Sequence, residues 1–230
     1  MADFVLVHGS GQNAASWHRV AALLRARGHT VATPELPKGS PPRAPAEHAA
    51  AVAGAMPGDA AIVVAHSLCG ALLPFVAQLR PCRARVYLAA VIPEPGKSVR
   101  EQYAADATMF DPEWIASGAK WFDPAARDEL ARRFLFHDCD AATLPWAMTT
   151  LATIDPALVV TTPSPRRGGS DAAMDTVIVA TRDRTLRPDW IARRSREAFG
   201  VEAVAIDAGH CPHVSRPDAV AAALAAVANA

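Results

Sequence analysis

One stretch of this chain, "AAIVVAHSLCGALLPFVAQL" at residues 60–79, carries most of the information about its fold. The stretch opens on an apolar, β-branched run typical of a buried strand and continues with residues typical of a helix. Ser67 stands at the junction, with the small residues Ala65 and Cys69 two positions away on either side. A serine in so sharp a strand-to-helix turn has a strained backbone and an exposed Oγ. We therefore predict a nucleophile elbow at Ser67 and, because proline disrupts a helix, a kink at Pro74.

Strand-like and helix-like segments alternate along the rest of the chain. Short apolar runs predict strands at residues 3–8, 30–36, 60–66, 84–91, 175–181 and 201–207. Helical patterns lie between them, at residues 16–28, 45–55, 68–79, 188–199 and 217–228. Continuous apolar strands of this kind suit a parallel sheet that is buried on both faces. The sequence therefore predicts an α/β fold, with a mostly parallel six-stranded sheet and helices on both faces.

The segment between the fourth and fifth predicted strands, residues 96–162, has no strand alternation and is rich in aromatic residues. It holds eight of the 14 aromatic residues of the chain. Such a segment forms either a small extra core or a lid over the carboxyl ends of the strands, where open α/β sheets bind their ligands. We favour a helical cap, which divides the chain into a core of residues 1–95 and 163–230 and a cap of residues 96–162. Candidate pocket residues are Trp121, Phe134, Trp146 and Met148.

A nucleophilic serine needs a general base and an acidic group that orients the base. His210 follows the last predicted strand, and Asp183 follows the fifth. The order Ser67, Asp183, His210 is the order that α/β-hydrolases use. Asp189 is the alternative acid.

Two backbone N–H groups are candidates for an oxyanion hole: that of Ser10, after the first strand, and that of Leu68, directly after the nucleophile. Together with the triad, they resemble the α/β-hydrolase superfamily and, more narrowly, its small esterase and hydroxynitrile-lyase group. In that group "HG" follows the first strand, and the catalytic histidine lies in a "GH" near the C-terminal end. The resemblance covers nearly the whole chain. It implies a carboxylesterase-type serine hydrolase that cleaves a small, largely apolar carboxylic ester, lactone or thioester through an acyl-enzyme, without a cofactor.

The sequence "GHCPH" at residues 209–213 is also compatible with a metal site. A zinc ion would need a fourth ligand, and the four cysteines form no CxxC pair. We therefore predict no metal site, with His210 as the base and His213 as a residue of the loop or rim.

Four other functions stay open. The run "HGSGQNA" at residues 8–14 fits a dinucleotide-binding fingerprint, but it leaves the candidate triad unexplained. Hydroxynitrile lyases resemble one another in a threonine after the first histidine and a lysine after the catalytic one, where this chain has Gly9 and Cys211. Other non-ester biosynthetic chemistry on the same triad, or a ligand-binding module with an inert triad, are the remaining alternatives.

Composition limits the classes of partner. Lys plus Arg and Asp plus Glu number 23 each, so the basic excess that is typical of nucleic-acid binders is missing. The apolar runs are too short to span a bilayer, and the N-terminal residues do not resemble a secretory signal. The four cysteines form no paired framework, which is typical of reduced thiols. We expect a cytoplasmic protein, a monomer or homodimer, that acts on a small molecule and binds no nucleic acid or membrane.

Overall fold

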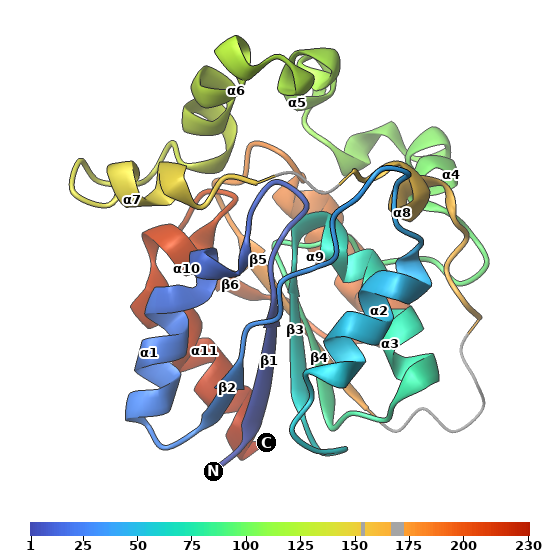
Figure 1. The fold of residues 1–230 in the computed structure, drawn as a ribbon. Coiled ribbons are helices and arrows are strands. Elements are labelled where there is room, and N and C mark those ends of the chain that lie inside the picture. Colours follow the sequence, from blue (N-terminus) through green and yellow to red (C-terminus); the bar gives the residue numbers. More distant parts are fainter. Residues whose placement is uncertain (153–154, 167–172) are drawn as a thin grey trace.

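Six parallel strands form one sheet in the computed structural model, which describes residues 1–152, 155–166 and 173–230 (Figure 1). The strands are β1 (Asp3–Val7), β2 (Thr30–Ala32), β3 (Ile62–His66), β4 (Ala84–Leu88), β5 (Met174–Ala180) and β6 (Val204–Ile206), in the order β2-β1-β3-β4-β5-β6. The predicted parallel α/β sheet is confirmed. All the strands except β5 are shorter than predicted, and β2, β4 and β6 are shortened the most.

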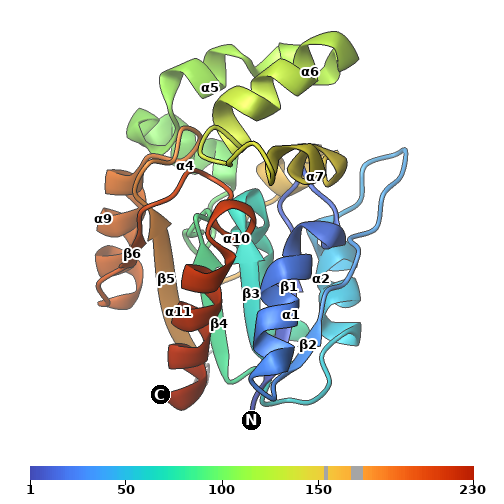
Figure 2. The same cartoon turned by 90° about the vertical axis from the view of Figure 1, so that its left-hand side faces the viewer.

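Helices cover both faces of this sheet because successive residues of each strand point to opposite sides. Phe4 and Leu6 of β1 pack in the cluster that includes α1 and α11, whereas Val5 and Val7 pack in the cluster that includes α2, α3 and α9. Figure 2 shows α1 and α11 side by side on the first of these faces. The bounds are α1 (His18–Ala26), α2 (Pro45–Gly54), α3 (Leu73–Leu79), α9 (Pro188–Phe199) and α11 (Pro217–Asn229).

The remaining longer helices belong to the segment between β4 and β5, which we call the insertion (residues 96–162). They lie above the carboxyl ends of the strands (Figure 1). The backbone closes the base of the insertion, where the N–H of Gly96 donates to Ser164 O (2.8 Å) and the N–H of Ser164 donates to Lys97 O (2.9 Å). The helices are α4 (Val99–Ala105), α5 (Pro112–Ala116), α6 (Pro124–Leu130), α7 (Leu144–Thr149) and α8 (Ala157–Thr161).

Short helical turns complete the described chain. They are the 3-10 turns η1 (Ala14–Trp17), η2 (Ser67–Leu72), η3 (Ala107–Met109) and η4 (Gly118–Phe122), the π-helical turn η5 (Ala131–Leu135), and the short helix α10 (Pro212–Ser215).

The prediction of a kinked helix at Pro74 is wrong. The chain instead forms the 3-10 turn η2 over Ser67–Leu72 and starts the helix α3 at Leu73. Pro74 therefore lies in the first turn of α3, where its missing N–H has no helical partner to lose. In the described part of the chain, no helix is both long and apolar enough to cross a membrane.

Candidate active site

Strand β3 ends at His66, and Ser67 turns the chain sharply into η2. Ser67 has a φ of +58°, in the left-handed region that non-glycine residues rarely adopt. Its carbonyl accepts a hydrogen bond from the N–H of Val91 (3.0 Å), beyond β4. A Cβ on Gly70 would lie 2.2 Å from Val91 O, so the tight approach needs glycine there. Cys69, the small residue one position before Gly70, is fully buried.

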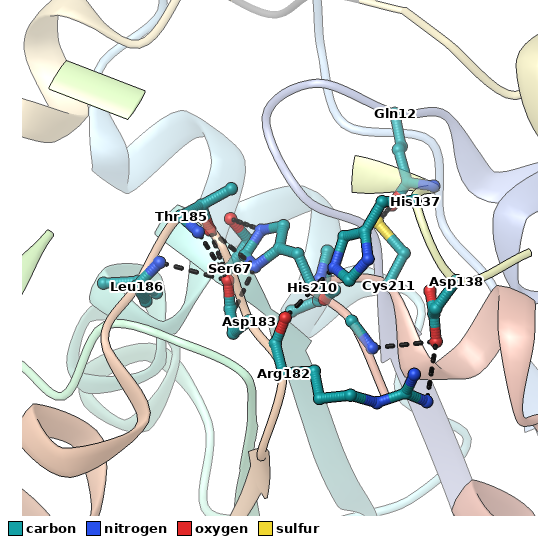
Figure 3. Close-up of polar contacts among 12 residues, drawn as sticks. Gln12, Ser67, His137, Asp138, Arg182, Asp183, Thr185, Leu186, His210 and Cys211 are labelled. Carbon is teal, nitrogen blue, oxygen red and sulfur yellow. Dashed lines mark hydrogen bonds and ion pairs between the residues drawn. The ribbon is translucent and has the colours of Figure 1, made fainter. Parts of the chain in front are cut away.

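The three residues of the predicted triad form a chain of two hydrogen-bond contacts, with His210 in the middle (Figure 3). Ser67 Oγ is 2.9 Å from His210 Nε2, and His210 Nδ1 is 2.8 Å from Asp183 Oδ2. Ser67 follows β3, Asp183 follows β5, and His210 follows β6, so parallel strands bring all three to one edge of the sheet. The alternative acid, Asp189, is exposed in the first turn of α9.

Asp183 has further partners that the sequence analysis missed. Its Oδ1 accepts hydrogen bonds from the N–H of Thr185 (2.7 Å), the hydroxyl of Thr185 (3.0 Å) and the N–H of Leu186 (3.2 Å). Thr185 Oγ1 also lies 2.6 Å from His210 Nδ1. An aspartate followed by a threonine two residues later is a pattern of side chain-to-backbone turns, and this pattern could have indicated the contact.

The loop of the predicted oxyanion donor Ser10 is fastened to the insertion. The N–H of Asn13 donates to Thr150 O (2.9 Å), and the N–H of Ala152 donates to Gly11 O (3.1 Å). Ser10 lines the cavity beside Ser67, whereas Leu68 is not among the described lining residues and packs against the core. The assignment of their N–H groups to an oxyanion hole stays a prediction.

Two buried histidines lie behind the triad. His66 Nε2–H donates to the carbonyl of His210 (2.8 Å), and its ring lies against those of His210 and His213. His213, which the sequence analysis expected at the loop or rim, is fully buried, stacks on Trp17 and donates from Nε2 to Gln12 Oε1 (3.2 Å). Burial and the neighbouring His210 lower the pKa of His213 to about 3, and burial lowers the pKa of His66 as well. Both rings are therefore neutral near pH 7.

Cys211 is one of the three residues that could have formed a metal site in the sequence "GHCPH". Burial raises the pKa of the Cys211 thiol, so the group stays protonated and is a poor metal ligand. Among the described residues, no group of three or more His, Cys, Asp and Glu side chains is arranged to hold a metal ion.

Asp138, in the insertion, anchors the loop that carries the base. Its Oδ2 accepts hydrogen bonds from the N–H of Gly209 (2.8 Å) and the hydroxyl of Ser215 (2.8 Å), on either side of His210. A Cβ on Gly209 would lie 2.7 Å from Asp138 Oδ1, so glycine permits the close approach. Asp138 was not predicted from the sequence, because an isolated aspartate in an insertion carries no signal of a distant loop.

A cavity of about 380 Å³ opens onto Ser67 and His210. Its apolar wall comes from the insertion, and its polar residues come from the loop after β1 and the triad. The described lining includes no Asp, Glu, Lys or Arg. The residues that supply the apolar wall are Trp114, Ile115, Trp121, Leu135 and Pro156.

Of the four predicted pocket residues, the structure places only Trp121 in the described cavity lining. Phe134 is buried and packs edge-on against Trp114. Trp146 lies under the guanidinium of Arg19, 4.5 Å from it, and Met148 packs in the small core of the insertion. The prediction was wrong for these three because their side chains pack against Trp114, Arg19 and the small core rather than along the cavity. The insertion therefore forms both a small core and one wall of a cavity.

Comparisons with known proteins agree with this architecture. The model of the alpha/beta hydrolase family matches residues 4–223. A probable esterase PIR7A from Oryza sativa subsp. indica is 36% identical over 107 aligned positions, covering 41% of each chain, so the match spans less than half of that relative. A pyrethroid hydrolase from Sphingobium wenxiniae is 26% identical over 253 aligned positions, covering 99% of this chain and 88% of the relative.

Solved structures show the same fold. A pyrethroid hydrolase from Sphingobium faniae JZ-2 superimposes with a TM-score of 0.80 at 24% identity, over 100% of this chain and 98% of that one. Polyneuridine aldehyde esterase superimposes with a TM-score of 0.75 at 19% identity, over 99% of each chain.

Proposed function

This chain belongs to the alpha/beta hydrolase family, and from that premise we propose that it is a carboxylesterase-type serine hydrolase with Ser67, His210 and Asp183 as its catalytic triad. One observation carries the proposal: the unbroken contact from Ser67 Oγ to His210 Nε2 (2.9 Å) and from His210 Nδ1 to Asp183 Oδ2 (2.8 Å). This is the geometry that nucleophilic activation of a serine needs.

The reaction proceeds in two halves. His210 accepts the hydrogen of the Ser67 hydroxyl as Oγ attacks the ester carbonyl, and Asp183 stabilises the imidazolium that forms. The tetrahedral oxyanion faces the N–H groups of Ser10 and Leu68. When the C–O bond breaks, His210 gives its proton to the departing alcohol and the acyl group stays on Ser67. Water, deprotonated by His210, then attacks the acyl-enzyme, and His210 returns that proton to Ser67 Oγ as the acid is released.

The cavity supports a small, neutral ester as substrate. Its wall of Trp114, Trp121 and Leu135 is apolar, and its described lining has no charged partner for a carboxylate. A charged substrate would lose its hydration there without compensation. The names of the relatives, an esterase and a pyrethroid hydrolase, also support cleavage of an ester by this chain.

Lyase chemistry on the same triad is less well supported. A cyanide leaving group needs a positive partner, and this chain has Cys211 at the position after His210. Burial raises the pKa of the Cys211 thiol, which is therefore neutral. Ester hydrolysis needs no such cation.

Steady-state hydrolysis of p-nitrophenyl butyrate tests the proposal. We expect turnover by the wild type and by Ser40→Ala, a control at an exposed serine, and a loss of at least about 1,000-fold in Ser67→Ala. Equal turnover by wild type and Ser67→Ala would contradict the proposal.

The mono-p-nitrophenyl ester of succinate, which carries a carboxylate on an acyl chain of the same length, tests the uncharged cavity. We expect a lower kcat/KM than for the butyrate ester. An equal or higher value would contradict the assignment of neutral substrates.

A further inference from the structure

The hydroxyl of Thr185 touches both members of the base–acid pair. Thr185 lies in the turn after β5 and is buried. Its Oγ1 is 2.6 Å from His210 Nδ1 and 3.0 Å from Asp183 Oδ1, while the same nitrogen of His210 is 2.8 Å from Asp183 Oδ2 (Figure 3). The three side chains therefore form a closed triangle of polar contacts.

The positions of the hydrogens follow from the chemistry of the three groups. A hydroxyl donates one hydrogen and accepts with its lone pairs. The charged carboxylate of Asp183 is a stronger acceptor than a neutral imidazole, so the Thr185 hydroxyl donates to Oδ1. Its lone pair then faces the Nδ1–H of His210, which is shared between Thr185 Oγ1 and Asp183 Oδ2. This tautomer leaves His210 Nε2 free to accept the hydrogen of Ser67.

Holding the carboxylate in place does not account for this hydroxyl. The N–H groups of Thr185 and Leu186 already donate to Asp183 Oδ1, at 2.7 and 3.2 Å. The contact that the hydroxyl alone supplies is the one to His210 Nδ1. As the ring becomes positively charged during proton transfer, an extra oxygen at Nδ1–H binds it more tightly.

We propose that Thr185 is a positioning residue of the triad, whose hydroxyl accepts the Nδ1–H of His210 while donating to Asp183 and so fixes the orientation and tautomer of the base. The role rests on the proposed serine hydrolase function, in which His210 takes the hydrogen of Ser67. Thr185 is not among the described residues that line the cavity, so it acts through the imidazole of His210.

Two substitutions separate the hydroxyl from the shape of the side chain. Thr185→Val keeps the shape and removes the hydroxyl, whereas Thr185→Ser keeps the hydroxyl. On p-nitrophenyl butyrate we expect kcat of the valine variant to fall by about 10- to 100-fold with KM nearly unchanged, because a hydrogen bond to a charged group is lost. The serine variant should recover most of the kcat. Thr181→Val, at an exposed threonine after the same strand, serves as the control and should match the wild type.

Two kinetic results would overturn the proposal. One is a valine variant with wild-type kcat, and the other is a serine variant as impaired as the valine variant. Thermal unfolding of each protein identifies a variant that has lost its fold.

A spectroscopic measurement on the protein without substrate separates this proposal from the proposed function. The downfield proton resonance of the imidazole N–H, assigned by its loss in His210→Ala, should move upfield in Thr185→Val and return in Thr185→Ser. An unchanged resonance in Thr185→Val would overturn the role of Thr185, even if the wild type hydrolyses esters. If the resonance moves in Thr185→Val but the wild type hydrolyses no ester, the hydrogen-bond assignment stands and the proposed function is refuted.

Discussion

Ser67 owes its orientation to neighbours rather than to its own preference. A left-handed conformation costs a non-glycine residue about 1–3 kcal/mol, so the surrounding contacts must hold it. One contact is the hydrogen bond from the N–H of Val91 to Ser67 O, and another is the close packing of Gly70 on the carbonyl of Val91. The segment that follows β4 therefore holds Ser67 in its strained conformation.

Substitution of Gly70 tests this support. A Cβ at Gly70 would lie 2.2 Å from Val91 O, which requires the backbone to shift. We expect Gly70→Ala to lower the free energy of unfolding by about 1–3 kcal/mol and to reduce turnover, since the shift displaces Ser67. Gly54→Ala, where no atom lies within 4 Å of the added Cβ, is the matched control and should be neutral or slightly stabilising. Denaturant unfolding compares the two. Equal stabilities would show that the elbow tolerates the extra atom.

Substitution of the acid tests the pairing of His210. In Asp183→Asn the amide keeps the shape of the carboxylate but loses the charge that stabilises the imidazolium, so we expect kcat to fall by about 10,000-fold. Asp189→Asn, at the exposed alternative, should retain wild-type kcat. Turnover that survives in Asp183→Asn and is lost in Asp189→Asn would reverse the assignment.

The sequence was sufficient to predict the residues of the contact chain from Ser67 through His210 to Asp183, because each has a conspicuous type and follows a recognisable strand. Thr185 and Asp138 were missed, since their contacts depend on side-chain geometry and on loops distant in the chain. Phe134, Trp146 and Met148 were misplaced because aromatic content alone does not distinguish the small core of the insertion from the cavity wall.

At the scale of elements, the insertion and the sheet meet at loops that carry site residues. Asp138 binds the loop before and after His210, and the backbone of Thr150 accepts a hydrogen bond from the loop after β1. The positions of the base and of the predicted oxyanion donor Ser10 therefore depend on the insertion as well as on the strands.

Removing the Asp138 anchor should affect both stability and turnover. Asp138→Ala leaves the Gly209 N–H without its acceptor and leaves the Ser215 hydroxyl only its longer contact with Cys211 O (3.4 Å), so we expect a loss of about 2–3 kcal/mol in the free energy of unfolding. We also expect kcat on p-nitrophenyl butyrate to fall, because His210 sits in the released loop. Asp128→Ala, at an exposed aspartate of the same insertion, is the control. Wild-type kcat in folded Asp138→Ala would show that the base needs no anchor from the insertion.

The existence and order of the six strands were predictable because their apolar runs are bounded by loop residues. Their ends were less predictable. Proline lacks the N–H that a sheet uses, and β2 ends at Ala32, two residues before Pro34, although the apolar pattern continues to Leu36. The break between η2 and α3 was missed for a similar reason, since Pro74 suits the start of a helix as well as a kink.

Across the whole molecule, the burial of neutral histidines makes the free energy of unfolding depend on pH. His213 has a folded pKa of about 3 against an ordinary value of 6.5. The unfolded chain therefore binds a proton at this residue between those values, while the folded chain does not. The contribution of neutral His213 to the free energy of unfolding is complete above pH 6.5 and is lost as the pH falls towards 3.

Replacement of His213 measures this contribution. In His213→Gln the side-chain amide can still donate to Gln12, but it does not titrate. We expect the free energy of unfolding to fall less steeply between pH 6.5 and 4 than in the wild type, by about 1.4 kcal/mol per pH unit. His18→Gln, at an exposed histidine, is the control and should keep the wild-type slope. Urea unfolding across this pH range gives the slopes, and identical slopes for His213→Gln and the wild type would show that His213 is not held neutral.

Labelling with a fluorophosphonate probe, followed by mapping of the modified residue by mass spectrometry, tests whether Ser67 is an activated nucleophile. The probe reacts with a serine only when a base activates its hydroxyl and the site accepts a tetrahedral centre. We predict a single adduct on Ser67 in the wild type and none in Ser67→Ala or His210→Ala. A folded wild type that stays unlabelled, or an adduct on a different residue, would contradict the assignment of Ser67 as the activated nucleophile.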